Sequence, residues 1–256
     1  GDINKCIKFY RKSLSIRERM KDEYGISNSL NNIGIIFQEQ GDLITALDYF
    51  LKSLEIRKKS ENPNLIATAY NNIGLCYSEM NEPSKAIQYF QRALELDKQS
   101  KNELSEGISL FNIGIAYKNL EQYENASEKY QESLLIFTRN SFVKEKANVL
   151  NYIAELKFLQ KDFTEAEKQY ETALVILSKL GHLDGLANTY MGLAQCYLES
   201  KDIIKAITYG KKSLELAKDL GYPERIRKAA YILSRIGEKT GDYQSAFNYL
   251  KQLILS

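Results

Sequence analysis

The feature that most constrains this chain is a repeat with a period of 40 residues that runs without a gap. One column of the repeat holds small residues, and the column four places later holds mostly aromatic ones. The small column is Ala46, Ala86, Ala126, Ala166, Ala206 and Ala246, preceded by Cys6, and the later column is Tyr10, Phe50, Phe90, Tyr130, Tyr170, Gly210 and Leu250. A unit of this length cannot bury its apolar face alone, so neighbouring units have to stack.

Each unit contains two helical patterns. In residues 25–64 the spacing i, i+3, i+4, i+7 occurs twice, first from Leu30 to Phe37 and then from Leu43 to Phe50. Small residues in the first pattern let two helices cross closely, and we expect the aromatic residue of the second helix to fill the space beside them. This further small column is Gly34, Gly74, Gly114, Ala154, Ala194 and Ser234.

The residues at the expected helix ends support this division. Asp42 can cap the second helix of its unit, and Pro83 lies one position into the equivalent helix, where its missing N–H costs nothing. Gly181 and Gly221 suit the left-handed residue that ends a helix. Only 14 Gly and 3 Pro occur in 256 residues, too few for a fold crowded with tight β-turns. We therefore predict an all-α fold of stacked antiparallel helix pairs.

The expected organisation is one solenoid over residues 1–256. Because Gly1-Asp2 aligns with Gly41-Asp42, residues 1–24 hold only the second helix of a unit. We therefore expect the chain to be a fragment of a longer protein. The complete units are expected at 25–64, 65–104, 105–144, 145–184 and 185–224, with an incomplete unit at 225–256.

These columns resemble the tetratricopeptide repeat, whose pattern carries Leu-Gly, a tyrosine and then Ala-x3-Phe. The resemblance implies a right-handed α-solenoid, although the period here exceeds the usual 34 residues, so the helices or the linkers must be longer. Asn-Asn-Ile-Gly at 31–34 and 71–74 resembles repeats of the kinesin light chain type. It is more similar to the sensory repeat region of bacterial histidine kinases and transcription regulators, common in Bacteroidetes, as is the stretch 229–246.

Composition disfavours several other classes of protein. The 35 basic and 33 acidic residues leave a net charge of +2, which offers no concentrated field for nucleic acid or anionic membranes. No stretch approaches the ~20 apolar residues that cross a bilayer, so we expect no direct membrane insertion by these residues. Cys6, Cys76 and Cys196 are isolated, and His182 is the single histidine. We therefore expect no metal site, no cofactor and no catalytic residue, so the chain is not predicted to be an enzyme.

The resemblance implies that the first helix of each unit lines a concave groove, so its non-core positions are candidates for ligand contact. Asparagine is a poor helix former, and its recurrence there indicates a role such as pairing with the main chain of an extended peptide. The alternative is that duplicated asparagines persist or brace neighbouring units. The candidate groove residues are Asn31, Asn32, Asn71, Asn72, Phe111, Asn112, Asn151, Tyr152, Glu155, Met191, Gln195, Tyr231 and Arg235.

The later part of this row is more apolar than the early part. Aromatic and methionine side chains on a concave surface suit the capture of apolar ligand groups. The alternative is that some of them complete the core, and Phe158 and Leu198 are equally consistent with either role.

Two functions from different classes follow. The first is a protein- or peptide-binding sensor or adaptor module of a bacterial signalling protein. The second is a structural assembly element that self-associates through its terminal helices. Three unpaired thiols favour a reducing compartment without excluding a periplasm, so the localisation stays open between the bacterial cytoplasm and periplasm.

Overall fold

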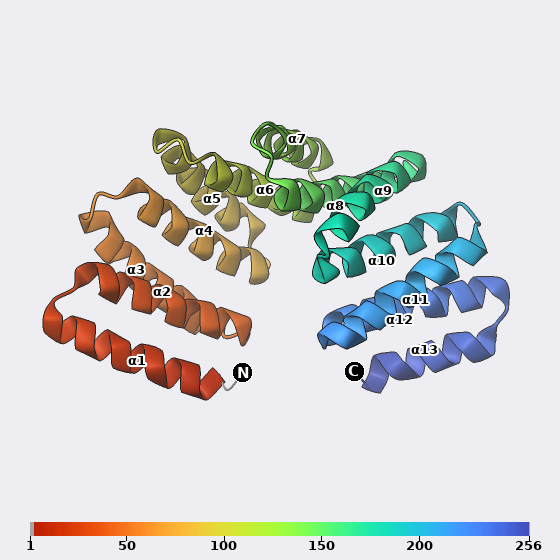
Figure 1. Ribbon diagram of the computed structural model, residues 1–256, viewed down its shortest axis with the longest axis horizontal. Coiled ribbons are helices and arrows are strands. Elements are labelled where there is room, and N and C mark those ends of the chain that lie inside the picture. Colours follow the sequence, from red (N-terminus) through yellow and green to blue (C-terminus); the bar gives the residue numbers. More distant parts are fainter. Residues whose placement is uncertain (1–2, 256) are drawn as a thin grey trace. The chain divides into compact units, whose positions relative to one another are not determined.

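The computed structural model describes residues 3–255, and every regular element in that range is an α-helix (Figure 1). The predicted all-α fold is therefore confirmed. The predicted alignment of Gly1-Asp2 and the side chain of Cys6 lie outside the described part of the chain. The helices are α1 Ile3–Met20, α2 Glu23–Glu39, α3 Leu43–Lys59, α4 Pro63–Glu79, α5 Pro83–Gln99, α6 Glu103–Asn119, α7 Tyr123–Arg139, α8 Val143–Leu159, α9 Phe163–Leu180, α10 Leu183–Glu199, α11 Ile203–Leu220, α12 Pro223–Thr240 and α13 Tyr243–Leu255.

The linkers between consecutive helices share one backbone conformation. Each contains a residue with a positive φ of 53–79°, and these residues recur every 20 positions from Lys21 to Gly241. Only Gly41, Gly181, Gly221 and Gly241 are glycines, so the other eight linkers place a side chain in the left-handed region. Because the linkers are short, the residues beyond the usual 34-residue period lie in the helices, most of which have 17 or 18 residues.

The predicted helix ends are confirmed. The Asp42 carboxylate accepts a hydrogen bond from the Thr45 backbone N–H, and Pro83 occupies the first turn of α5. Gly181 and Gly221 follow α9 and α11 with φ of 62° and 68°. His182 is the residue before α10, and its Nδ1 accepts a hydrogen bond from the Gly185 N–H at 3.0 Å. The single histidine therefore caps a helix.

The alanine column forms the centre of the packing. All six alanines, from Ala46 to Ala246, are buried. A Cβ added to Gly74 would lie 2.5 Å from the nearest carbon of the Phe90 ring, so only glycine accommodates that ring. Gly34 with Phe50 and Gly114 with Tyr130 repeat this arrangement, which confirms the predicted pairing of the small and aromatic columns.

The aromatic residue of a later repeat also contacts the following first helix. A Cβ added to Gly192 of α10 would collide with the Tyr170 ring, so this ring lies against α10. At the small position within the same repeat as Tyr170 stands Ala154, which is fully buried and belongs to the same apolar cluster.

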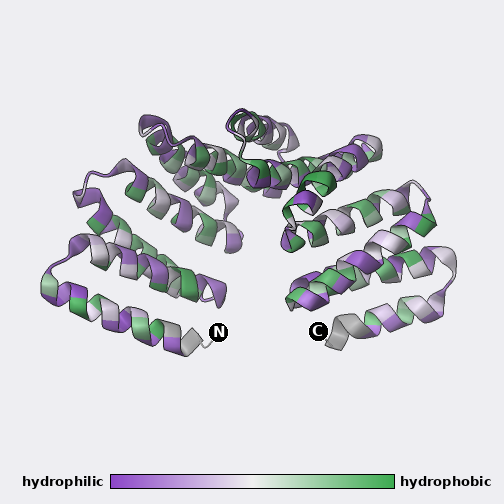
Figure 2. Ribbon diagram, viewed as in Figure 1, coloured by the Kyte–Doolittle hydropathy of each residue, from purple (hydrophilic) through white to green (hydrophobic). Residues whose placement is uncertain are grey.

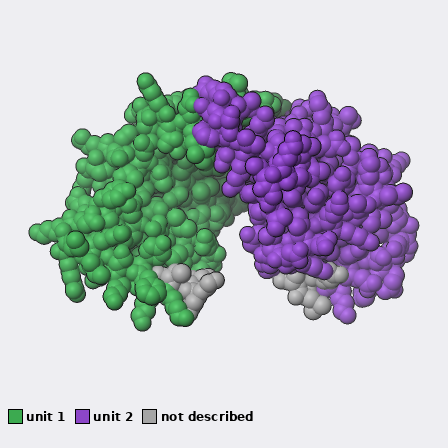
Figure 3. Space-filling view, viewed as in Figure 1, with its two compact units in different colours: residues 1–136 green, residues 137–256 purple. Residues whose placement is uncertain are grey.

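The chain divides into two compact units, residues 1–136 and 137–256 (Figure 3). In the first unit, two apolar clusters form around Phe50 and Phe90, between α3 and α4 and between α5 and α6. In the second unit, one cluster extends from α8 to α12 and includes Tyr170, Leu193 and Leu233. Hydrophilic and hydrophobic residues alternate around the helices, as amphipathic helices in a stack require (Figure 2).

Candidate functional site

The candidate groove residues lie on the first helices of the repeats. In the first unit these helices are α2, α4 and α6, and in the second unit they are α8, α10 and α12. Direct contacts join α4 to α6, α8 to α10 and α10 to α12. Each unit therefore has a surface on which the first helices of neighbouring repeats lie side by side, called here the first-helix surface.

In the first unit, asparagines of neighbouring repeats bond to one another. The Asn72 Nδ2 donates to Asn31 Oδ1 at 2.8 Å, and Asn112 Nδ2 donates to Asn71 Oδ1 at 3.3 Å. Each bond joins positions 41 residues apart, so the donor comes from one asparagine column and the acceptor from the other. These amides brace adjacent repeats, which is the alternative role that the sequence leaves open for them.

The Asn71 amide also leads to a buried acidic group. Its Nδ2 donates to Ser109 Oγ at 3.0 Å, and Ser109 Oγ donates to Asp97 Oδ2 at 2.7 Å. Asp97 is buried, and the loss of hydration raises the pKa of its carboxyl, while the Ser109 bond opposes that rise. Two hydrogen-bonded side chains thus connect the amide row to a carboxylate at the end of α5.

The amides differ in how far a ligand could reach them. Asn31 and Asn112 are buried, whereas Asn32, Asn71 and Asn72 are half-buried. Within the described residues, the Asn32 carboxamide takes part in no hydrogen bond. A carboxamide has two N–H donors and an acceptor oxygen, so Asn72 keeps its oxygen after donating to Asn31. Asn32 and Asn72 are therefore the amides of this row that suit contact with a ligand.

The second unit presents a different set of side chains. Asn151 is buried and accepts a hydrogen bond from Thr189 Oγ1 at 3.0 Å, while Tyr152 and Glu155 are half-buried. Burial and the nearby Glu155 raise the pKa of Tyr152. Of the candidate residues, Tyr231 and Arg235 on α12 are exposed to solvent.

The apolar candidates divide between surface and core. Leu198 is buried, and Met191 and Phe158 pack against the core cluster of the second unit. Gln195 is half-buried on α10. In the first unit, the Phe111 ring lies 5.8 Å from the Tyr130 ring, measured between centroids. Most of these side chains therefore contribute to packing as well as to the first-helix surface.

Sequence reasoning missed two matching aromatic groups, one in each unit. Tyr77 and Tyr89 stack with ring centroids 5.3 Å apart, and Tyr197 and Tyr209, 120 residues later, stack at 5.5 Å. A lysine lies over the first ring of each pair, Lys85 at 5.3 Å and Lys205 at 4.6 Å from the centroid. Cys76 and Cys196 are also 120 residues apart. A comparison of 40-residue repeats that lie three repeats apart could therefore have found both aromatic groups.

Both cysteines whose side chains the structure describes are buried. Desolvation raises the pKa of Cys76 and Cys196 to about 12, so both thiols stay protonated at neutral pH. In the part of the chain that the structure describes, no group of three or more His, Cys, Asp and Glu could hold a metal ion. Among the described helices, none combines the length and apolar content that spanning a bilayer requires.

Three comparisons with known proteins bear on this fold. The protein BtubC (BKLC) from P. vanneervenii is 19% identical, with a TM-score of 0.73, over 87% of this chain and 93% of that one. Aspartyl phosphate phosphatase F from Bacillus subtilis is 16% identical, with a TM-score of 0.80, over 97% and 64%. The Rap conjugation gene regulator of plasmid pLS20, solved with the Phr* peptide, is 14% identical, with a TM-score of 0.73, over 91% and 74%.

Sequence profiles agree with the repeat described above. No curated relative matches the chain. One tetratricopeptide repeat profile matches residues 1–59, 25–99 and 145–219, and a second matches residues 108–137. These matches together cover more than half of the chain. The chain belongs to the tetratricopeptide repeat family.

Proposed function

We propose that this chain is a non-catalytic module that binds an extended polypeptide along the first-helix surface. The observation that carries the proposal is the amide row of the first unit. Asn32 and Asn72 are half-buried there, and the hydrogen bonds between repeats leave donors and acceptors of both side chains for a ligand. Because amides pair with a peptide main chain through both its N–H and C=O groups, such a row can hold a peptide with little regard to its sequence.

The braces between repeats favour this role. A ligand bond gains most when the protein group is already fixed, because less side-chain entropy is lost on binding. Asn72 is held by its bond to Asn31, so its oxygen has a defined position before any ligand arrives. The plasmid pLS20 regulator, which has the same fold, was solved with a peptide, and this supports a peptide as the ligand here.

The finer role that we propose is the sensor or adaptor region of a bacterial signalling protein. Of the similar structures, one is named as a phosphatase of aspartyl phosphate and another as a gene regulator. In such a role, peptide binding would shift the arrangement of the repeats and so alter the output of an attached domain.

The test begins with a display library of random 12-residue peptides selected on the immobilised protein. We expect Asn32→Ala with Asn72→Ala to weaken the binding of selected peptides at least tenfold. Two amide bonds contribute roughly 0.5–1.5 kcal/mol each, and a tenfold change corresponds to about 1.4 kcal/mol. The matched control replaces the exposed Gln88 and Gln91 of α5 by alanine and should leave affinity unchanged. Equal affinities for the two double variants, or no selected peptide at all, would refute the proposal.

Self-association is the second candidate function, and exposed apolar side chains on the terminal helices favour it. Phe9 and Met20 of α1 and Phe247 of α13 are each more than half exposed. Apolar patches of this kind often mark contact surfaces. Sedimentation velocity over a hundredfold range of protein concentration separates the two candidates. A mass that rises with concentration, and falls after Phe9→Glu with Phe247→Glu, supports assembly.

A further inference from the structure

Apart from the asparagine columns, one further position of the 40-residue repeat carries polar residues only in the first compact unit. It lies near the end of each second helix and holds Arg17, Arg57 and Asp97 on α1, α3 and α5. In the second unit the same position holds Phe137, Leu177 and Ala217, all apolar. Each of the three polar side chains bonds to the following first helix: Arg17 to Ser29, Arg57 to the Leu65 carbonyl oxygen, and Asp97 to Ser109.

Two of these polar residues meet a serine, and one does not. The Arg17 Nη1 donates to Ser29 Oγ at 2.7 Å and to the Gly25 carbonyl oxygen at 2.8 Å. Asp97 accepts from Ser109 at the equivalent place. At the repeat position of Ser29 and Ser109, the helix that follows Arg57 carries Ala69, which is fully buried and has no polar side-chain atom. Arg57 is therefore the member of this column whose usual partner is missing.

The Arg57 guanidinium is buried without an acid to balance its charge. It is 3% exposed and donates to the Leu65 carbonyl oxygen at 3.0 Å and to Asn28 Oδ1 at 3.2 Å, both neutral acceptors. Its Nε is buried and has no hydrogen-bond partner. Desolvation lowers the pKa of this group, as expected for a cation removed from water. Buried charges are normally paired, so this arrangement leaves a site for an anion.

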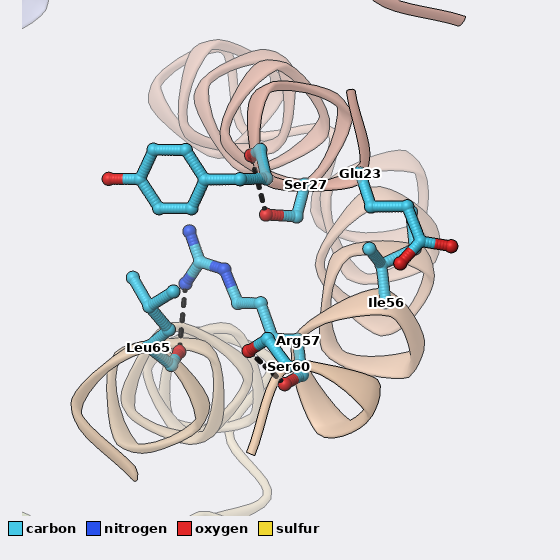
Figure 4. A pocket seen from close by; sticks show the side chains of 7 residues that line it. Glu23, Ser27, Ile56, Arg57, Ser60 and Leu65 are labelled. Carbon is cyan, nitrogen blue, oxygen red and sulfur yellow. Dashed lines mark hydrogen bonds between the residues drawn. The ribbon is translucent and has the colours of Figure 1, made fainter. Parts of the chain in front are cut away.

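A small cavity adjoins the guanidinium (Figure 4). Its volume is about 40 Å³, and it is lined by Glu23, Tyr24, Ser27, Ile56, Arg57, Ser60 and Leu65. A single water needs roughly 10–15 Å³ on the same measure, so the cavity has room for a group of two or three heavy atoms. The serine hydroxyls are already used, because Ser27 donates to the Tyr24 carbonyl oxygen and Ser60 to that of Arg57. Arg57 Nε is thus a buried donor beside this cavity that lacks a partner.

We propose that this cavity binds a carboxylate group against the Arg57 guanidinium. A planar carboxylate matches the fork of N–H donors on a guanidinium, and its size fits the space. Glu23 at the rim opposes an incoming anion, so the site favours a small group with a single charge. The carboxylate comes either from a free small acid or from an acidic side chain of a partner polypeptide. This site does not depend on peptide binding at the first-helix surface.

The direct probe is the Arg57 Nε–H resonance in arginine-labelled protein, identified by its loss in Arg57→Gln. We expect acetate to shift this resonance in a saturable way, with half-saturation on the order of millimolar. Chloride at equal ionic strength should not shift it. The Arg17 resonance is the internal control, because that side chain is half-buried and its Nη1 already donates to Ser29 and Gly25.

Two further variants make the experiment decisive. Ala69→Ser places a hydroxyl at the position equivalent to Ser29, which accepts from Arg17 Nη1. A hydroxyl there should draw Arg57 Nη1 toward α4, turn the guanidinium away from the cavity and weaken acetate binding at least fivefold. Glu23→Gln should strengthen acetate binding by removing the like charge at the rim. Acetate shifts that are absent in the natural sequence, matched by chloride, or unchanged by Ala69→Ser would overturn the proposal. Binding that appears only after Glu23→Gln would also overturn it, because Glu23 would then be the occupant.

Two short peptides, acetyl-Gly-Glu-Gly-amide and its glutamine counterpart, distinguish the two sources of the carboxylate when their binding is measured by the same resonance. A glutamate peptide that binds more tightly than acetate, while the glutamine peptide does not bind, identifies an acidic side chain of a partner. Acetate binding without peptide binding identifies a free small acid. Both results support the site.

Discussion

The substitution Gly74→Ala tests the packing that defines this fold. In an ordinary helix interior, this change stabilises by about 1 kcal/mol, because alanine is the better helix former. Here the new Cβ would lie 2.5 and 2.7 Å from two carbons of the Phe90 ring. Carbon atoms normally approach no closer than about 3.5 Å, so the ring or the helix must move by roughly 1 Å. Phe90 is 1% exposed, so its ring has no open space to enter.

Overpacking of this kind typically costs 1–3 kcal/mol, and a buried ring places the value near the upper end. After the helix-propensity gain is subtracted, we expect a net loss of about 1–2 kcal/mol. For a chain of this size, that loss lowers the melting temperature by roughly 2–8 °C. Circular dichroism at 222 nm during heating, supported by urea unfolding, measures the change.

The matched control is Thr68→Ala, an alanine substitution at an exposed position of the same helix, which should be neutral or slightly stabilising. A rescue variant combines Gly74→Ala with Phe90→Leu, because a smaller side chain makes room for the methyl group. The double variant should lose less than the sum of the two single losses. A Gly74→Ala protein that melts at or above the parent temperature would refute the proposed steric pairing.

Three other predictions follow from the linkers, the buried acid and the thiols. Gly181→Ala should cost about 1 kcal/mol through backbone strain alone, because its φ is 62° and an added Cβ meets no atom within 4 Å; thermal unfolding measures the loss. Burial raises the pKa of Asp97, so the folded state holds that proton to higher pH than the unfolded state, and stability should rise as the pH falls toward about 4. Asp97→Asn should remove this rise in urea midpoints measured across that range. In a Cys6→Ser background, Cys76 and Cys196 should react with maleimide only on unfolding, because their pKa is about 12; mass spectrometry of native and urea-treated samples checks this.

The sequence alone sufficed for the fold because the alanine and aromatic columns occupy fixed positions in every unit. Their steric roles depend on residue size, which the sequence states directly. Positions with mixed chemistry were harder to assign. Leu198 is buried, yet the same column holds Gln38, Ser78 and Lys118 in earlier units, so periodicity left its role undecided.

The candidate site was less predictable because its geometry depends on how neighbouring first helices are offset. Alignment at steps of 40 pairs Asn32 with Asn72, but the observed bond joins Asn31 to Asn72 at a step of 41. The missing partner of Arg57 also required the structure, since nothing in the sequence shows that its Nε lies buried without a hydrogen bond. The role of the thirteen candidate residues in ligand binding stays a prediction.

The hydrogen bonds between asparagines give the stack a direction. Each donor lies in the later repeat and each acceptor in the earlier one, as in Asn72 to Asn31 and Asn112 to Asn71. A duplicated or transplanted unit therefore keeps both hydrogen bonds only if it carries an acceptor at the first of these positions and a donor at the second. The last 40-residue unit within residues 25–144 has Phe111 at the first position and so offers no acceptor. An engineered array that is extended by copying the unit that contains Asn71 and Asn72 would carry both groups in every copy.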